Sequence, residues 1–251
     1  MSDGPNYSTA LRPVPIAQEA RCCYNRGMDD LQTELDVWPG LADVEYFARA
    51  QAGGWGDMLR AFARFIDLPP GGTVLDVGAG PGLLPRLLVK GGARLAVGCD
   101  DSLAMVRRAV ELARPDRSSE TCQISLAADA LRLPFADAAF DAALATNLLF
   151  LLPDPAAGWL ALARVVRPGG IVACLNPSEA MCVSAAAAFM DARGVGGFGR
   201  FSFVNYARLA EAHHRLPVDA WLALARDAGL IDLRAETRAG ELVLFVRGAK
   251  S

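Results

Sequence analysis

The sequence lacks the features that mark membrane-spanning, secreted, disordered and nucleic-acid-binding proteins. No run of about 18 apolar residues occurs, so a membrane-spanning helix is not expected. The first residues have neither the basic nor the apolar region of a secretory signal. Hydrophobic residues make up 53% of the 251 residues, which excludes disorder, and 25 basic against 28 acidic side chains leave no basic excess for binding phosphates. This balance excludes only nucleic-acid binding that is driven by bulk charge.

Cysteine and histidine occur in no arrangement typical of a disulfide framework or a metal centre. The six cysteines include no CxxC pair, and the chain is long enough to bury a core without disulfides. Cys99, Cys122 and Cys174 lie in apolar runs and are expected to be small core residues. No zinc-site spacing is present, so no metal is expected. We therefore expect a cytoplasmic protein with one large domain, with or without a small appendage.

From residue 73 onward, short apolar runs alternate with helical patterns. This alternation predicts βαβ units, a parallel sheet and right-handed crossovers. Before it, residues 42–66 have an apolar stripe typical of a helix, with a break near Gly53 and Gly54. The last two apolar runs are too close for a crossover helix, so they must pair antiparallel. The expected strands are 73–77, 94–99, 122–127, 140–146, 171–175, 230–234 and 242–247, and the later helices are 82–90, 102–113, 155–166 and 217–228.

The most informative segment is VLDVGAGPGLL at residues 74–84, which leads from a strand through a glycine loop into a helix. Glycines allow tight turning and let a ligand approach the main chain. The dinucleotide fingerprint G-x-G-x-x-G is not matched, because the spacing is G-x-G-x-G and Leu83 occupies the third-glycine position. Asp76, two residues before the first glycine, suits a cationic, ammonium or hydroxyl donor better than a pyrophosphate. The loop therefore favours S-adenosylmethionine, which has a sulfonium and an ammonium group and no phosphate.

The segment DVGAGPG at 76–82 resembles the first motif, D/E-x-G-x-G-x-G, of the class I S-adenosylmethionine-dependent methyltransferases. Further segments resemble family motifs in the same order: GCDDS at 98–102, ADALRLPF at 128–135, FD at 140–141 and RVVRPGG at 164–170. Within this superfamily the chain is most similar to methyltransferase type 11 and to the ubiquinone and menaquinone C-methyltransferases. The resemblance implies an α/β, Rossmann-like fold with a seven-stranded, mostly parallel sheet. It also implies one antiparallel edge strand, helices on both faces and an N-terminal helical cap.

The resemblance implies where S-adenosylmethionine, and its product S-adenosylhomocysteine, would bind. Asp100 maps onto the acid that binds the ribose hydroxyls, although Asp101 beside it leaves the assignment open. Asp129 maps onto the acid beside the adenine N6. Asn147 and Leu148 follow the fourth strand and should flank the methionyl part of the cofactor or the substrate. The expected cofactor-binding residues are Asp76, Gly78, Ala79, Gly80, Gly82, Asp100, Asp101, Ser102, Met105, Asp129, Ala130, Leu131, Thr146, Asn147 and Leu148.

These acids also have simpler roles. Asp76 could be a strand-end cap, and Asp100 or Asp101 could be an acid that favours the start of a helix. Asp129 could be a surface turn residue. Motif matches of this kind are hypotheses until a structure places the side chains.

No motif identifies a catalytic residue. Methyl transfer from a sulfonium is an in-line displacement that mainly requires alignment and exclusion of water, and a base is needed only if the nucleophile arrives protonated. His213 and His214 are candidate bases. Tyr24 resembles a tyrosine in the N-terminal helix of related enzymes that closes over the cofactor. The cysteines at 22–23 with Cys174 resemble those of arsenite methyltransferases, but the family's spacing is not reproduced.

Two regions are expected to cover a substrate. Residues 1–68 should form an arm and a helical cap, and 69–251 the methyltransferase domain with a lid insertion at about 177–216. In this insertion aromatic residues alternate with glycines, which is typical of a mobile lid over an apolar cavity. An ordinary helix followed by a surface loop is the alternative. Trp38 and Trp55 are expected to be packing residues.

The sequence thus predicts an S-adenosylmethionine-dependent methyltransferase acting on a small, apolar or aromatic molecule. We expect a monomer or homodimer without a membrane span and without a nucleic-acid partner. The alternatives are a protein or RNA methyltransferase, a non-catalytic cofactor-binding paralogue and an NAD(P)-dependent oxidoreductase. The acceptor and the attacking atom are not identified by any motif.

Overall fold

The fold is organised around one mixed sheet. The computed structural model describes residue 38 and residues 41–113 and 122–251. Within these residues the strand order is β3-β2-β1-β4-β5-β7-β6. The strands are β1 (Thr73–Val77), β2 (Leu95–Asp100), β3 (Cys122–Ala127), β4 (Phe140–Thr146), β5 (Val166–Pro177), β6 (Leu230–Arg238) and β7 (Val243–Lys250).

The strand directions agree with the expected α/β fold. The first five strands in this order, β3, β2, β1, β4 and β5, are mutually parallel. Strand β7 pairs antiparallel with both β5 and β6. The mostly parallel, seven-stranded sheet with one reversed strand is therefore confirmed. The reversed strand β7 lies one place in from the edge, and β6 is outermost.

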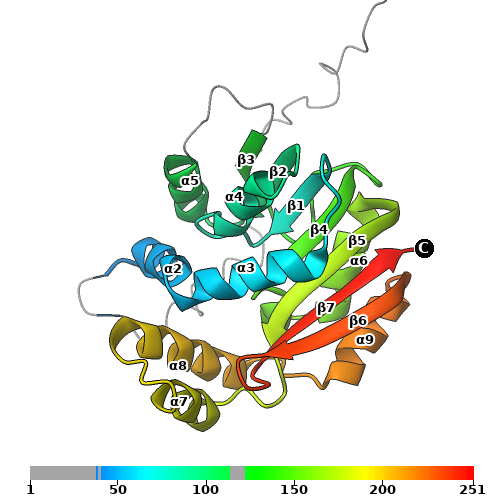
Figure 1. Cartoon of the computed structure of the whole chain (residues 1–251). Coiled ribbons are helices and arrows are strands. Elements are labelled where there is room, and N and C mark those ends of the chain that lie inside the picture. Colours follow the sequence, from blue (N-terminus) through cyan, green and yellow to red (C-terminus); the bar gives the residue numbers. More distant parts are fainter. Residues whose placement is uncertain (1–37, 39–40, 114–121) are drawn as a thin grey trace, which may run out of the picture.

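Helices cover both faces of the sheet. Figure 1 shows α3 crossing one face, with α6 and α9 on the opposite face. Helices α7 and α8 pack against each other below the sheet in this view. The helices are α2 (Asp43–Ala52), α3 (Gly54–Ile66), α4 (Leu83–Lys90), α5 (Leu103–Leu112), α6 (Pro155–Val165), α7 (Val183–Asp191), α8 (Gly197–Ala212) and α9 (Val218–Asp227), with a short 3-10 turn at Leu149–Leu151.

Helix α3 attaches the N-terminal part of the described chain to the sheet. Its apolar residues recur at helical spacing, and Leu59, Phe62 and Ile66 are buried. The Phe62 ring packs edge-on against Phe245 of β7, with 5.2 Å between ring centroids. The predicted break in this helical region is confirmed, because α2 and α3 separate at Gly53.

The centre of the sheet forms the core. Strands β1, β4 and β5 are buried along most of their length, as expected for parallel strands covered on both faces. Cys99 and Cys174 are buried, as the apolar runs predicted. The same prediction was wrong for Cys122, which is exposed because it begins β3, the outermost strand on its side of the sheet.

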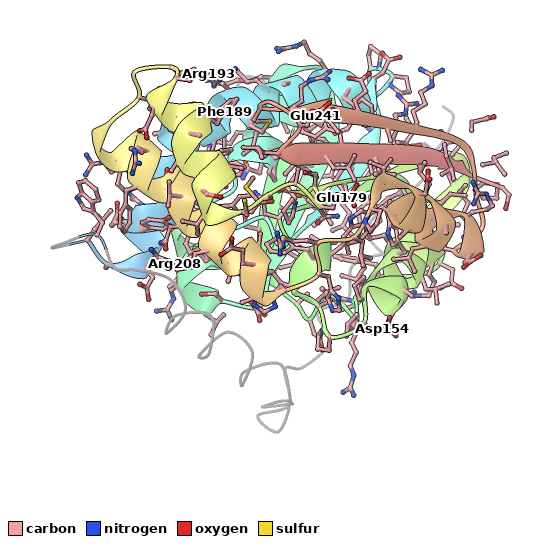
Figure 2. All side chains as sticks on the ribbon, turned by 90° about the horizontal axis from the view of Figure 1, so that it is seen from below. Asp154, Glu179, Phe189, Arg193, Arg208 and Glu241 are labelled. Atoms are coloured by element: carbon pink, nitrogen blue, oxygen red, sulfur yellow. The ribbon has the colours of Figure 1, made fainter. Side chains whose placement is uncertain are left out.

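The segment 177–216 contains two helices, α7 and α8. The ring of Phe189 on α7 lies 5.5 Å from that of Phe203 on α8. Phe189 also packs against the β6–β7 turn, since its Cδ2 is 3.0 Å from the position that a Cβ on Gly240 would take. Figure 2 shows Phe189 beside Glu241 of the same turn. The first contact joins α7 to α8, and the second joins this segment to the sheet.

None of the described helices is long and apolar enough to cross a membrane.

Candidate functional site

A cavity of about 430 Å³ opens at the carboxyl ends of β1, β2 and β4. This edge is where open α/β sheets bind ligands, and the volume is within the range of small-molecule sites. Most of the lining residues come from the ends of these strands and of β3 and the loops that follow them, from the helices α2 and α3, and from helix α8. The loop residues that line it are Gly78, Gly80, Pro81, Asp100, Asp101, Ser102, Ala128, Ala130, Thr146, Asn147 and Leu148, and Met105 of α5 joins them.

The glycine loop after β1 is fixed on β2 by its backbone. The N–H groups of Gly78 and Ala79 both donate to the Cys99 carbonyl oxygen, at 2.8 and 3.0 Å. Gly80 has a φ of 53°, in the region that favours glycine, and the nearest atom to a Cβ added there is Gln51 Nε2 at 3.7 Å. Gly80 therefore leaves its main chain open toward the cavity.

Asp100 links the glycine loop to the start of α5. Its carboxylate accepts the Gly80 N–H at 2.8 Å through Oδ2 and the Ser102 N–H at 3.0 Å through Oδ1. Burial raises the pKa of Asp100 to about 6, although these two hydrogen bonds act in the opposite direction. Burial also raises the pKa of Asp101 beside it. Two carboxylates thus line the cavity, at the two positions that the family resemblance offers for binding the ribose.

Asp76 does not reach the cavity. Only 1% of its surface is exposed, and neither carboxylate oxygen has a hydrogen-bond partner among the described residues. Burial raises its pKa well above the usual range, and the charge of Asp100 adds to this. Asp76 belongs to β1 at the centre of the sheet, in register with Gly98 of β2 and Leu144 of β4.

Asp129 also lies outside the lining residues, although its neighbours Ala128 and Ala130 belong to them. Its Oδ1 accepts the Leu131 N–H at 2.8 Å, which is the local bond of a turn residue. Three further predicted cofactor residues, Ala79, Gly82 and Leu131, do not line the cavity either. Gly82 has a structural position at the N-cap of α4.

Asn147 combines an unusual backbone conformation with an unpaired side-chain oxygen. Its φ is 56°, and its N–H donates to the Leu175 carbonyl at 2.8 Å. Its Oδ1 is buried, without a partner among the described residues. A backbone conformation of this kind in a cavity wall is typical of functional positions.

The opposite wall of the cavity is aromatic. The Tyr206 ring of α8 packs edge-on against Trp55 and Phe150, with centroids 4.6 and 5.7 Å apart. Tyr46 of α2 accepts a hydrogen bond from Asn205 Nδ2 at 3.4 Å, which joins α2 to α8. Burial raises the pKa values of Tyr46 and Tyr206, so both hydroxyls stay protonated near neutral pH.

Most of this wall could not be recognised from the sequence. Trp38 and Trp55, expected as packing residues, line the cavity as well as packing against other rings. Tyr46 and Phe150 were not singled out. The sequence shows each of them only as an aromatic residue in an apolar helix or loop, and ordinary core residues have the same pattern.

The candidate catalytic residues do not come together at the cavity. His213 and His214 follow the end of α8, outside the lining residues, and the His214 N–H donates to the Phe150 carbonyl at 3.2 Å. Their role as a base stays a prediction. Tyr24 and the cysteines at 22–23 lie outside the described residues, while Cys174 is buried in β5. No group of three His, Cys, Asp or Glu residues in the described chain could hold a metal ion.

Residues 75–174 match the family model "Methyltransferase domain". The chain is 35% identical over 216 residues to a demethylmenaquinone methyltransferase of Parafrankia, an alignment that covers 76% of this chain and 82% of the relative. It is 41% identical over 111 residues to a demethylmenaquinone methyltransferase of Corynebacterium kroppenstedtii, covering 44% of each chain. It is also 40% identical over 119 residues to the 2-methyl-6-phytyl-1,4-hydroquinone methyltransferase of Synechocystis, covering 46% of this chain and 36% of that protein. The chain thus spans less than half of these last two relatives.

Solved structures share the fold. An S-adenosylmethionine-dependent methyltransferase from Mesorhizobium loti superposes with a TM-score of 0.59 at 22% identity, covering 80% of this chain and all of that one (100%). At this identity the likeness concerns the fold alone.

Proposed function

The chain belongs to the class I S-adenosylmethionine-dependent methyltransferases, in the group of the quinone methyltransferases, and on this premise we propose that it transfers a methyl group from S-adenosylmethionine to a small, uncharged, aromatic or apolar molecule. The observation that carries the proposal is the asymmetry of one cavity. A glycine loop and two carboxylates line one side, and aromatic rings line the other.

The polar side fits the proposed cofactor. Gly80 leaves room for a ligand against the main chain, and Asp100 offers a carboxylate to ribose hydroxyls. The buried, unpaired Oδ1 of Asn147 offers an acceptor to a hydroxyl or ammonium donor. S-adenosylmethionine supplies an activated methyl group, so the protein has to align the acceptor and keep water out.

The aromatic side argues for an uncharged acceptor. Among the described lining residues the only ionised side chains are Asp43, Asp100 and Asp101, and none is basic. An anionic acceptor would have no counter-ion there, so the free-energy cost of its desolvation would not be offset. Flat rings of an acceptor can pack against Trp55, Phe150 and Tyr206 by edge-to-face contacts. The acceptors named for the relatives, demethylmenaquinone and a phytyl hydroquinone, suit such a wall and support this chemical class.

The proposed mechanism assigns no general base to the described chain. Tyr46 and Tyr206 remain protonated, and neither histidine lines the cavity. The residues at the cavity therefore act by holding the acceptor in line with the methyl group and by excluding water. The acceptor must contribute an electron-rich atom itself, as a ring carbon beside a phenolic oxygen does. The ring proton that the methyl group replaces would then pass to water.

We also propose the domain organisation predicted from the sequence. In it, residues 1–68 are the arm and cap, 69–251 form the methyltransferase domain, and 177–216 are the lid. Helices α2 and α8 both line the cavity and are joined by the hydrogen bond between Asn205 and Tyr46, which supports a covering role for both. Movement of the lid can be tested by hydrogen exchange of α8 with and without S-adenosylhomocysteine.

The test of the proposed function is the rate of S-adenosylhomocysteine formation with three kinds of acceptor. These are an alkylated hydroquinone, an anionic small molecule and a protein or RNA mixture. We expect turnover with the hydroquinone alone. Turnover only with protein or RNA would replace the small-molecule proposal, and cofactor binding without any turnover would identify a non-catalytic paralogue.

A further inference from the structure

Gln51 of α2 is placed between the helical cap and the glycine loop. Its side chain lines the cavity, and its Oε1 accepts the N–H of Leu83, the first residue of α4, at 3.2 Å. This N–H is one of the groups that a helix leaves without an internal partner at its start. The bond joins residues that are 32 positions apart, so it fixes how α2 lies against the loop.

The same bond fixes the direction of the amide nitrogen. With Oε1 held by Leu83, the two N–H donors of Nε2 lie beside Gly80, 3.7 Å from the position a Cβ on Gly80 would take. Gly80 has no side chain to fill this space, and its φ of 53° strains any substitute. A pair of neutral donors therefore faces the open part of the loop.

The charges around the cavity leave one group of the proposed cofactor without a partner. Among the described lining residues the ionised side chains, Asp43, Asp100 and Asp101, are all acidic. They suit the ammonium, sulfonium and hydroxyl groups of S-adenosylmethionine. Its carboxylate needs N–H donors instead, and it would be repelled by these acids.

We propose that Gln51 binds the carboxylate at the amino-acid end of the cofactor through Nε2, while Oε1 holds the first turn of α4. The inference rests on the proposed function, because it assumes that S-adenosylmethionine is the ligand. The positive end of α4 lies next to the same amide and favours an anion there. Cofactor recognition then includes the cap helix α2, whose Tyr46 forms part of the aromatic wall.

The decisive variant is Gln51→Glu. A glutamate keeps an oxygen that can accept the Leu83 N–H at the start of α4, so the contact between α2 and α4 is preserved. It removes the amide donors and places a negative charge where the cofactor carboxylate would lie. The matched control is Glu45→Gln on the same helix. It removes the ion pair of Glu45 with Arg108 of α5, a second attachment of α2 that does not line the cavity.

The measurement is calorimetric binding of two ligands to each protein. S-adenosylhomocysteine contains the amino-acid end, and 5′-methylthioadenosine lacks it. We expect Gln51→Glu to weaken S-adenosylhomocysteine binding at least about tenfold and to leave 5′-methylthioadenosine binding within about twofold. Glu45→Gln should change neither affinity by more than about twofold.

Two results would overturn the inference. Equal losses for both ligands in Gln51→Glu would mean that the residue acts only through the loop, and unchanged binding of both would mean that it does not contact the ligand. If the unmodified protein binds neither ligand, the proposed function fails first, and the inference with it. The wild-type titration therefore distinguishes the two failures.

Discussion

The carboxylate of Asp100 makes the affinity for the cofactor depend on pH. Burial raises the pKa of Asp100 to about 6, while the N–H groups of Gly80 and Ser102 donate to its two oxygens. Ribose hydroxyls donate hydrogen bonds, so they bind the ionised carboxylate best. The affinity should therefore approach its maximum above pH 7 and decline as the pH falls through 6.

The size of the effect follows from the ionised fraction. A group with a pKa of about 6 is about nine-tenths ionised at pH 7 and about one-tenth ionised at pH 5. The dissociation constant for S-adenosylhomocysteine should rise about tenfold over this range, which corresponds to about 1.4 kcal/mol. The amino and carboxyl groups of the ligand titrate outside this range.

The variant Asp100→Asn removes the titrating group. An amide cannot accept both backbone N–H groups, and it loses the charge that strengthens bonds to ribose. We expect binding about 10- to 100-fold weaker at pH 7 and little change between pH 7 and 5. Asp101→Asn is the matched control. Since the charge of Asp101 contributes to the raised pKa of Asp100, its removal should keep the transition and move the midpoint below 6.

Calorimetric titrations of the three proteins from pH 5 to 7 decide this prediction. A dissociation constant that does not change with pH in the unmodified protein would refute the assigned role of Asp100. A transition that survives in Asp100→Asn and vanishes in Asp101→Asn would transfer that role to Asp101.

Other substitutions separate folding from binding. Gly82→Ala should lower the free energy of unfolding by about 1–3 kcal/mol in denaturant titrations, because φ is 75° and the new Cβ would lie 3.0 Å from Ala109 Cβ. Gly80→Ala should lower the free energy of unfolding less than Gly82→Ala and weaken S-adenosylhomocysteine binding more, because the new Cβ enters the open space beside the loop. Equal losses of stability in the two variants would contradict this. A carboxyl whose pKa is raised by folding destabilises the protein as pH rises above about 3.8, so Asp76→Asn should raise the melting temperature at pH 8 and not at pH 4. Trp55→Ala should raise KM for the acceptor more than KM for S-adenosylmethionine; equal increases would remove Trp55 from the acceptor site.

The parts of the fold that depend only on residues adjacent in the sequence could be predicted from it. The glycines at 78 and 80 predicted a tight loop after the first strand, and both residues adopt the positive φ values that glycine favours. The helix that follows Ser102 began where an N-cap was expected, and the Ser102 side chain accepts the Met105 N–H. These features arise from a few consecutive residues, so their pattern is visible in the chain itself.

The direction of individual side chains could not be predicted. Asp76 and Asp100 both lie near strand ends in family motifs, yet only Asp100 lines the cavity, because the position of each residue in its strand decides which way it points. The aromatic wall was hidden for another reason. Trp55 and Tyr206 come from helices far apart in the chain and resemble ordinary core residues until the helices are packed.

The position of β7 also required the structure. The short connection between the last two strands indicated an antiparallel pair, but either strand could have joined β5. Pairing of β7 with β5 over Ile171–Pro177 makes β6 the edge. This choice depends on contacts between distant segments, which no local pattern encodes.

Transfer of a labelled methyl group tests the central claim most directly. The protein is incubated with S-adenosylmethionine that carries a trideuterated methyl group and with an alkylated hydroquinone, and the acceptor is examined by mass spectrometry. The account predicts a product in which the trideuterated methyl group replaces one hydrogen of the hydroquinone, and its loss in Asp100→Asn at limiting cofactor. An acceptor that stays unlabelled while the protein binds S-adenosylhomocysteine would contradict it.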